Sequence, residues 1–170
     1  MKKCPMCKKI CIRERNGIRI SKFCSNCRKI KKQEKKIKHE QTKSYLERKW
    51  KILHGTAWKL QSEYIRRKYA KNDMVQCYTC NTIDHWKNMH CGHFWHNKLD
   101  FDERNLRPQC SQCNVFKSGN LAEYATKLTK EIGVEGMQKL RLNSNTISYS
   151  TEDLEKIIQN LTIELEKYND

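Results

Sequence analysis

Residues 77–120 read CYTCNTIDHWKNMHCGHFWHNKLDFDERNLRPQCSQCNVFKSGN and contain two Cys-x2-Cys pairs about thirty residues apart. Thiolates at this spacing are typical ligands of a tetrahedral zinc ion, and four of them close its coordination shell. We therefore predict a structural zinc site that is formed by Cys77, Cys80, Cys110 and Cys113. A plain zinc ribbon would carry the same cysteines, so the polar residues between and after the pairs decide whether the segment has chemistry.

Three of these polar residues suit the hydrolysis of a phosphodiester. That reaction needs a base for water, a cation that relieves the phosphoryl charge, and groups that orient the base. His93 ends a predicted strand, Asn105 lies in the following loop, and Asn114 begins a predicted helix. A histidine can accept the proton, and an amide can hold its ring in the accepting tautomer. We therefore predict that His93, Asn105 and Asn114 are catalytic, with the zinc-bound cysteines positioning them.

A second cysteine set lies at the N-terminus, in residues 1–29. It consists of two further Cys-x2-Cys pairs, Cys4, Cys7, Cys24 and Cys27. Isoleucines between the pairs flank Asn16-Gly17, which is a strong signal for a tight hairpin turn. This region is predicted to be a small zinc ribbon with a structural ion, in which Cys11 could replace Cys7 as a ligand.

The ten cysteines allow either disulfides or metal ligation, and their pairing favours metal. The opening Met1-Lys2-Lys3-Cys4 does not resemble a signal peptide, and no apolar run approaches the length of a membrane span. Only 37% of the residues are hydrophobic, so a thick apolar core is not expected. We expect a cytoplasmic protein without a membrane partner.

Positive charge is concentrated in the first part of the chain. Residues 1–72 carry 24 Lys and Arg against 5 Asp and Glu, whereas residues 73–170 carry 11 against 14. We predict that residues 30–72 form a basic arm of one or two helices that tracks phosphates, the alternative being a solvated helical spacer. The predicted DNA contacts are Lys31, Lys32, Lys35, Lys36, Arg66, Arg67 and Lys117, although Lys117 could equally be a helix-surface residue.

Helices are predicted for the rest of the chain. One runs from Leu121 to Ile132 and ends at Gly133, and a short second helix follows within the C-terminal region 134–170. Residues 143–149 are predicted to be a loop, and Ser150 with Asp153 caps the last helix. The apolar stripe of that helix either packs on the core or forms a dimer contact; it consists of Leu154, Ile157, Ile158, Leu161, Leu165 and Tyr168.

The motifs in residues 73–133 resemble the NinG/Rap recombination endonucleases of phages and, more loosely, zinc-clamped HNH nucleases. The resemblance is carried by both cysteine pairs, by Gly92-His93-Phe94, and by the run Lys117-Ser118-Gly119-Asn120 that follows the second pair. It implies a ββα-metal (HNH) nuclease core in which His93 is the general base and Asn114 binds the catalytic Mg²⁺ or Mn²⁺. This chain departs from most HNH enzymes in having Gly92 before the base. The NinG-like pattern has an acidic residue three positions before the base, where this chain has His90 as a candidate ligand.

These observations predict an α+β protein with a zinc ribbon, a basic helical arm, a zinc-clamped nuclease domain and C-terminal helices. By resemblance it would be a DNA endonuclease for branched intermediates of phage recombination, such as Holliday junctions or D-loops, working in the host cytoplasm. A homodimer would suit symmetrical cutting of a junction. Two alternatives stay open: a non-catalytic zinc-finger protein that binds nucleic acid, and a sequence-specific homing or restriction-type nuclease.

Overall fold

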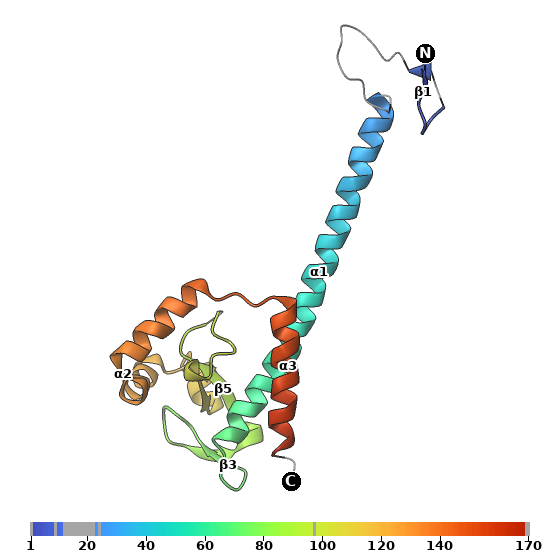
Figure 1. Cartoon of the computed structure of the whole chain (residues 1–170). Coiled ribbons are helices and arrows are strands. Elements are labelled where there is room, and N and C mark those ends of the chain that lie inside the picture. Colours follow the sequence, from blue (N-terminus) through green and yellow to red (C-terminus); the bar gives the residue numbers. More distant parts are fainter. Residues whose placement is uncertain (1, 9, 12–22, 24, 97, 169–170) are drawn as a thin grey trace. The chain divides into compact units, whose positions relative to one another are not determined.

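The computed structural model describes residues 2–8, 10–11, 23, 25–96 and 98–168 (Figure 1). The chain divides into two compact units, Met1–Lys49 and Trp50–Asp170, which are described separately below. The helix α1 (Ser25–Lys68) begins in the first unit and ends in the second. The predicted domain limits at residues 29, 72 and 133 stay predictions.

The first unit contains a small sheet and the N-terminal part of α1. The strands β1 (Lys2–Lys3) and β2 (Ile10–Cys11) pair antiparallel, with Lys2 opposite Cys11. The hairpin predicted around Asn16-Gly17 lies outside the described residues. Lysines and glutamates dominate this part of α1, and four-residue spacing brings Lys36 within 3.9 Å of Glu40.

Two antiparallel hairpins form the sheet structure of the second unit. Strand β3 (Met74–Gln76) pairs with β4 (Ile83–His85), and β5 (His90–His93) pairs with β6 (Leu106–Gln109). In the second hairpin His93 lies opposite Leu106, so the long loop of residues 94–105 joins its strands. Short helical turns complete the hairpins: η1 (Trp86–Asn88), η2 (Glu103–Asn105) and the π-helical turn η3 (Gln112–Phe116).

Two helices follow, and their limits depend on local sequence signals. The helix α2 (Leu121–Thr146) is interrupted at Gly133, where φ is 71°, as predicted for a residue that tolerates positive φ. Its second part reaches Thr146, so the predicted loop over residues 143–149 is wrong for its first four residues. The capping box of Ser150 and Asp153 is confirmed at the start of α3 (Thr151–Glu166).

The apolar stripe of α3 packs within its own unit. Leu161 and Leu165 form a cluster with Tyr64 and Ile65 of α1, and the two helices lie side by side (Figure 1). Packing on the core, one of the two predicted uses of the stripe, is therefore confirmed. The homodimer stays a prediction.

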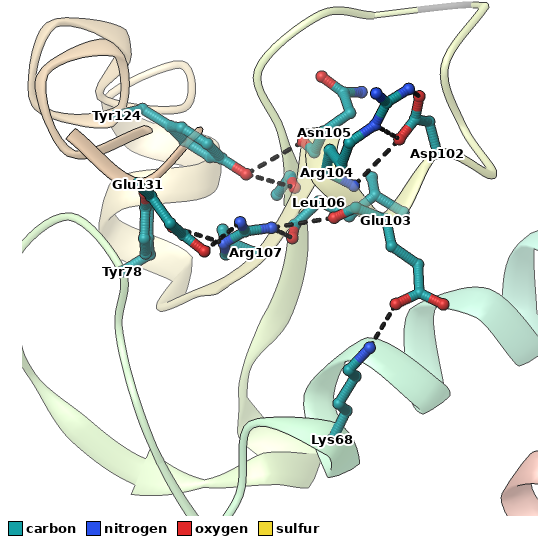
Figure 2. Close-up of polar contacts among 11 residues, drawn as sticks. Lys68, Tyr78, Asp102, Glu103, Arg104, Asn105, Leu106, Arg107, Tyr124 and Glu131 are labelled. Atoms are coloured by element: carbon teal, nitrogen blue, oxygen red, sulfur yellow. Dashed lines mark hydrogen bonds and ion pairs between the residues drawn. The ribbon is translucent and has the colours of Figure 1, made fainter. Parts of the chain in front are cut away.

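An ion pair between a buried guanidinium and a partly exposed carboxylate attaches α2 to the second hairpin. The guanidinium of Arg107 on β6 pairs with Glu131 of α2, and the hydroxyl of Tyr78 donates to the same carboxylate at 2.9 Å (Figure 2). The buried hydroxyl of Tyr124 donates to the carbonyls of Gly92 and Asn105 at 3.2 and 3.1 Å. These contacts fix the hairpin that carries His93.

The predicted α+β class is confirmed, with mostly helix and small antiparallel sheets. None of the helices among the described residues is both long and apolar enough to cross a bilayer.

Candidate zinc centres and histidine pocket

Four cysteine thiols meet where the two hairpins adjoin. Cys77 and Cys80 lie in the turn after β3, and Cys110 and Cys113 follow β6. The four sulfur atoms lie within 4.8 Å of one another, and the amide of Tyr78 donates to the carbonyl of Pro108 at 2.8 Å. This core cysteine cluster fits a tetrahedral zinc ion, so it could hold the predicted structural zinc.

The core cysteine cluster also favours a thiolate. The hydroxyl of Thr82 lies 3.2 Å from Sγ of Cys80 and, as the largest cause, lowers the pKa of Cys80 to about 6. Burial raises the pKa of Cys110 to about 12. A cation in the cluster would favour deprotonation of all four thiols, which is the state that zinc requires.

A second cluster of thiols lies in the first unit. Sulfur atoms of Cys4, Cys7 and Cys27 lie within 4.8 Å of one another, so three of the four predicted ligands come together and could hold zinc. The fourth predicted ligand, Cys24, lies outside the described residues, and so does the side chain of Cys11.

An open pocket of about 540 Å³ lies beside β5. The described residues that line it include one guanidinium and three imidazoles but no carboxylate. They are Trp58, Ser62, Arg66, Met89, His90, Cys91, His93, His96 and Asn114. We refer to this site as the histidine pocket. Its lining suits an anion, because the guanidinium is cationic and none of the described lining groups is anionic at neutral pH. Burial raises the pKa of the Cys91 thiol to about 12, so this thiol is neutral as well.

His93, the predicted base, is held in place on two sides. Its ring stacks on Trp58, with centroids 4.4 Å apart and planes inclined by 15°. Its Nε2 atom lies 3.4 Å from Oδ1 of Asp100, a residue of the loop between β5 and β6. With Nε2 facing a carboxylate, Nδ1 is the ring nitrogen left to accept a proton.

Asn105 does not perform the predicted task of holding the imidazole. It is fully buried, and its side-chain oxygen accepts a hydrogen bond from the amide of Trp95 at 2.8 Å. Its side-chain nitrogen donates to the carbonyls of Trp95 and Leu99 at 2.8 and 3.2 Å. Asn105 therefore fixes the loop that carries Asp100, while His93 is oriented by Asp100 and Trp58.

Asn114 and His90, the predicted ligands of a catalytic ion, both line the histidine pocket with His93. Gly92 cannot supply the ligand that most HNH enzymes have there. A Cβ atom at residue 92 would lie 2.1 Å from Oε1 of Gln109, whose side-chain nitrogen donates to the carbonyl of Gly119 at 2.7 Å. The side chain of Gln109 therefore fills the space that a side chain at residue 92 would need.

The predicted DNA contacts fall into two groups. Lys31, Lys32, Lys35, Lys36 and Lys117 are exposed. Arg66 lines the histidine pocket and donates to the carbonyl of Trp86 at 3.2 Å. Arg67 is engaged within the fold, because it pairs with Glu63 at 2.8 Å and its guanidinium lies 4.2 Å from the centre of the Trp86 ring.

Comparison with known proteins identifies the family. A model described as Bacteriophage Lambda NinG protein matches residues 2–169. The chain belongs to the NinG family.

Named relatives within the family share part of the chain. Protein ninG of Escherichia phage 933W is 34% identical over 89 residues, which cover 49% of this chain and 43% of the relative. Protein ninG of Escherichia phage lambda is 33% identical over 89 residues, which cover 49% of this chain and 42% of the relative. Protein ninG of Enterobacteria phage H19B is 40% identical over 60 residues, which cover 35% of this chain and 30% of the relative. The match spans less than half the length of these curated relatives. No solved structure matches the chain.

These findings correct the resemblance drawn from the motifs. The grouping with Rap endonucleases and HNH nucleases is wrong, because the matching family model and the relatives above carry the name NinG alone. The motif run after the second cysteine pair is thus a feature of this NinG-family chain, and it does not by itself assign the chain to a nuclease family.

Several pocket residues of this NinG-family chain were not predicted. Trp58 and Ser62 were not predicted, and Arg66 was predicted as a DNA contact but not as part of this pocket. The three are spaced by four residues on α1, so their common face was a signal that the sequence contained. The acidic loop residues Asp100, Asp102 and Glu103 were not among the predicted site residues either. Asp102 does pair with Arg104 at 2.6 Å and Glu103 with Lys68 (Figure 2), but Asp100 lies between two histidines.

Proposed function

We propose that this NinG-family chain is a metal-dependent DNA endonuclease that cuts branched intermediates of phage recombination, such as Holliday junctions or D-loops, in the host cytoplasm. The observation that carries the proposal is the histidine pocket. It combines a base candidate, an amide and a guanidinium in one open site whose described lining holds no carboxylate.

The pocket suits a phosphodiester by charge and by hydrogen-bonding chemistry. Burial lowers the pKa of Arg66, yet a guanidinium stays protonated at neutral pH and favours a phosphate oxygen. Ser62 and Arg66 lie one helical turn apart on α1, so a hydroxyl and a cation face the same space. Because the pocket is open, a bulky strand of DNA can reach it.

His93 would act as the base in this site. The O–H bond of a water molecule breaks as its proton passes to Nδ1 of His93, and the hydroxide oxygen forms the new bond to phosphorus. The imidazolium that results would lie beside the carboxylate of Asp100 and face the ring of Trp58, and both contacts favour a cation. The bond from phosphorus to the leaving oxygen then breaks.

The residues fit Mn²⁺ better than Mg²⁺, because Mn²⁺ accepts an imidazole ligand more readily. His90 and Asn114 would hold it, and a nitrogen-containing donor set without carboxylate favours Mn²⁺ over Mg²⁺. Such an ion supplies charge relief to the phosphate and stabilises the leaving oxygen.

The basic arm supports a substrate that is recognised by its shape. The exposed lysines on α1 suit contacts with phosphates that read no bases, which is the mode expected of a protein that recognises a branch and not a sequence. A zinc-finger protein that only binds nucleic acid would also need the arm and the cysteine clusters. It would not need an imidazole oriented by a carboxylate in an open pocket.

A cleavage assay on paired substrates tests the proposal. A four-way junction and a linear duplex of the same sequences are incubated with the full chain and Mn²⁺, Mg²⁺ or EDTA. We expect cutting of the junction with Mn²⁺, slower cutting with Mg²⁺, none with EDTA, and little cutting of the linear duplex. Binding without cleavage under every condition would contradict the proposal and favour the zinc-finger alternative, whereas equal cutting of both substrates would contradict the preference for branches.

A further inference from the structure

Asp100 is a mostly buried carboxylate between two imidazoles. Its Oδ2 atom lies 3.2 Å from Nε2 of His54, and its Oδ1 atom lies 3.4 Å from Nε2 of His93. The side chain of Asp100 is 14% exposed, and within the described part of the chain its ion-pair partners are these histidines and no Lys or Arg. A buried charge requires partners that donate to it.

This arrangement selects one tautomer of each ring. Because a carboxylate oxygen faces each Nε2 atom, the proton is favoured on Nε2 and the lone pair of a neutral ring is left on Nδ1. Asp100 does not line the histidine pocket, whereas His93 does. Asp100 therefore engages Nε2 of His93 without lining the pocket itself, and Nδ1 is the ring nitrogen of His93 left to accept a proton.

The surroundings of the carboxylate keep it in this position. Asn105 fixes the backbone at Trp95 and Leu99, directly before Asp100. His54 stacks on Trp50 with ring centroids 4.7 Å apart, and Phe101 meets the same imidazole edge-on at 5.3 Å. His54 is thus held between two aromatic rings, and it can fix the second oxygen of the carboxylate.

We propose that Asp100 is the positioning residue for His93, and that His54 holds Asp100 in register for that task. This inference rests on the proposed function, because it assigns a role around the proposed base. During the reaction the Nε2–H bond of His93 stays intact, the water proton goes to Nδ1, and the negative charge of Asp100 stabilises the imidazolium without accepting the proton.

Substitution of Asp100 by Asn tests this role, with Asp102→Asn as the matched control. Asp102 lies in the same loop and is 12% exposed, but it pairs with Arg104 and not with an imidazole. We expect Asp100→Asn to lower kcat on the junction about 10- to 100-fold with KM nearly unchanged, and His54→Leu to lower it about fivefold. Asp102→Asn should keep kcat within about twofold of the wild type.

Non-additivity separates positioning from a loss of structure. If Asp100 acts through His93, adding Asp100→Asn to His93→Ala should not slow any residual cleavage further. A double variant that is slower by the product of the two single effects would overturn the proposal, and so would an Asp100→Asn variant with wild-type kcat.

Nitrogen NMR of the ¹⁵N-histidine-labelled full chain provides a readout that needs no cleavage. We expect neutral His93 to carry its proton on Nε2, and this preference to weaken in Asp100→Asn but not in Asp102→Asn. A proton on Nδ1 in the wild type would overturn the inference whether or not the chain cuts DNA. If His93 has the expected tautomer but no substrate is cut, the proposed function fails while the pairing of Asp100 with His93 stands.

Discussion

Gly92 shows how one residue beside the proposed base is constrained by packing. The backbone of residue 92 is close to the side chain of Gln109 on the paired strand, and Tyr124 donates a hydrogen bond to the carbonyl of Gly92 at 3.2 Å. Gln109 in turn reaches the hydroxyl of Thr79 at 3.0 Å, next to the core cysteine cluster. A methyl group at residue 92 would therefore displace Gln109 and disturb its hydrogen bond with Thr79, and it could also disturb the bond from Tyr124.

The first prediction follows from this packing. Gly92→Ala should lower the free energy of unfolding by about 1–3 kcal/mol, because the added Cβ overlaps Gln109. Urea unfolding followed by circular dichroism measures the change. Gly55→Ala, at a helical position where nothing lies within 4 Å of the added atom, is the control and should be neutral or slightly stabilising. An unchanged midpoint for Gly92→Ala would contradict the packing argument.

At the residue scale, the sequence allowed part of the site to be predicted. His90, His93 and Asn114 meet in one pocket because paired cysteines bring their segments together, and that spacing is visible in the sequence. The pairing of His54 with Asp100 depends on a contact between α1 and a loop with no regular structure, and no periodicity encodes such a contact. For the same reason, Asn105 was predicted to orient the imidazole of His93, although its side chain bonds the backbone of Trp95.

At the element scale, α2 is held on the second hairpin by the pair of Arg107 and Glu131 (Figure 2). Arg107 also donates to the carbonyls of Glu103 and Leu106 at 2.9 and 2.6 Å. Burial raises the pKa of Glu131, but hydrogen bonds from Arg107 and Tyr78 outweigh it and hold this pKa below its ordinary value. The interruption of α2 and the start of α3 were predictable because Gly133 and Ser150 act locally, whereas this long-range pair was not.

The second prediction concerns this pair. Glu131→Ala should destabilise the fold by about 2 kcal/mol, less than for a fully buried pair because the Glu131 side chain is 43% exposed. The depressed pKa means that the carboxylate stabilises the fold above its unfolded pKa of about 4.3, and that this contribution is lost as pH falls through the lower folded value. The unfolding temperature of Glu131→Ala should therefore lie well below that of the wild type at pH 7, and the difference should become smaller in acid. Glu135→Ala, an exposed position on the same helix, should show no difference at either pH.

At the scale of the whole molecule, charge is divided between the first unit with its basic helix and the second unit with its histidine pocket. Residues 1–49 of the first unit carry 18 Lys and Arg against 4 Asp and Glu, whereas residues 50–170 of the second carry 17 against 15. The sequence predicted a basic helical arm, but it did not show that a single helix continues from Ser25 to Lys68. Such continuity depends on the absence of any residue that ends a helix. Because Gly55 could have ended one, the sequence was compatible with either one helix or two.

The third prediction tests the arm through its salt dependence. Replacing Lys31, Lys32, Lys35 and Lys36 by Gln removes up to four phosphate contacts, so the slope of log affinity against log salt should become shallower by about 3–4. Fluorescence anisotropy with labelled junction DNA at several salt concentrations measures this slope. Replacement of the four exposed acids Glu135, Glu152, Glu155 and Glu166 by Gln should not make the slope shallower. An unchanged slope for the lysine variant would show that the arm does not carry the binding.

The most direct test of the central claim compares His93→Ala with the wild type on the same junction DNA in Mn²⁺. Cleavage rate, junction affinity and bound zinc are measured on the full chain. The account predicts that cleavage falls by at least about 100-fold while affinity and zinc content stay within about twofold of the wild type. Cleavage at the wild-type rate by a folded, DNA-binding His93→Ala variant would contradict the assignment of His93 as the base.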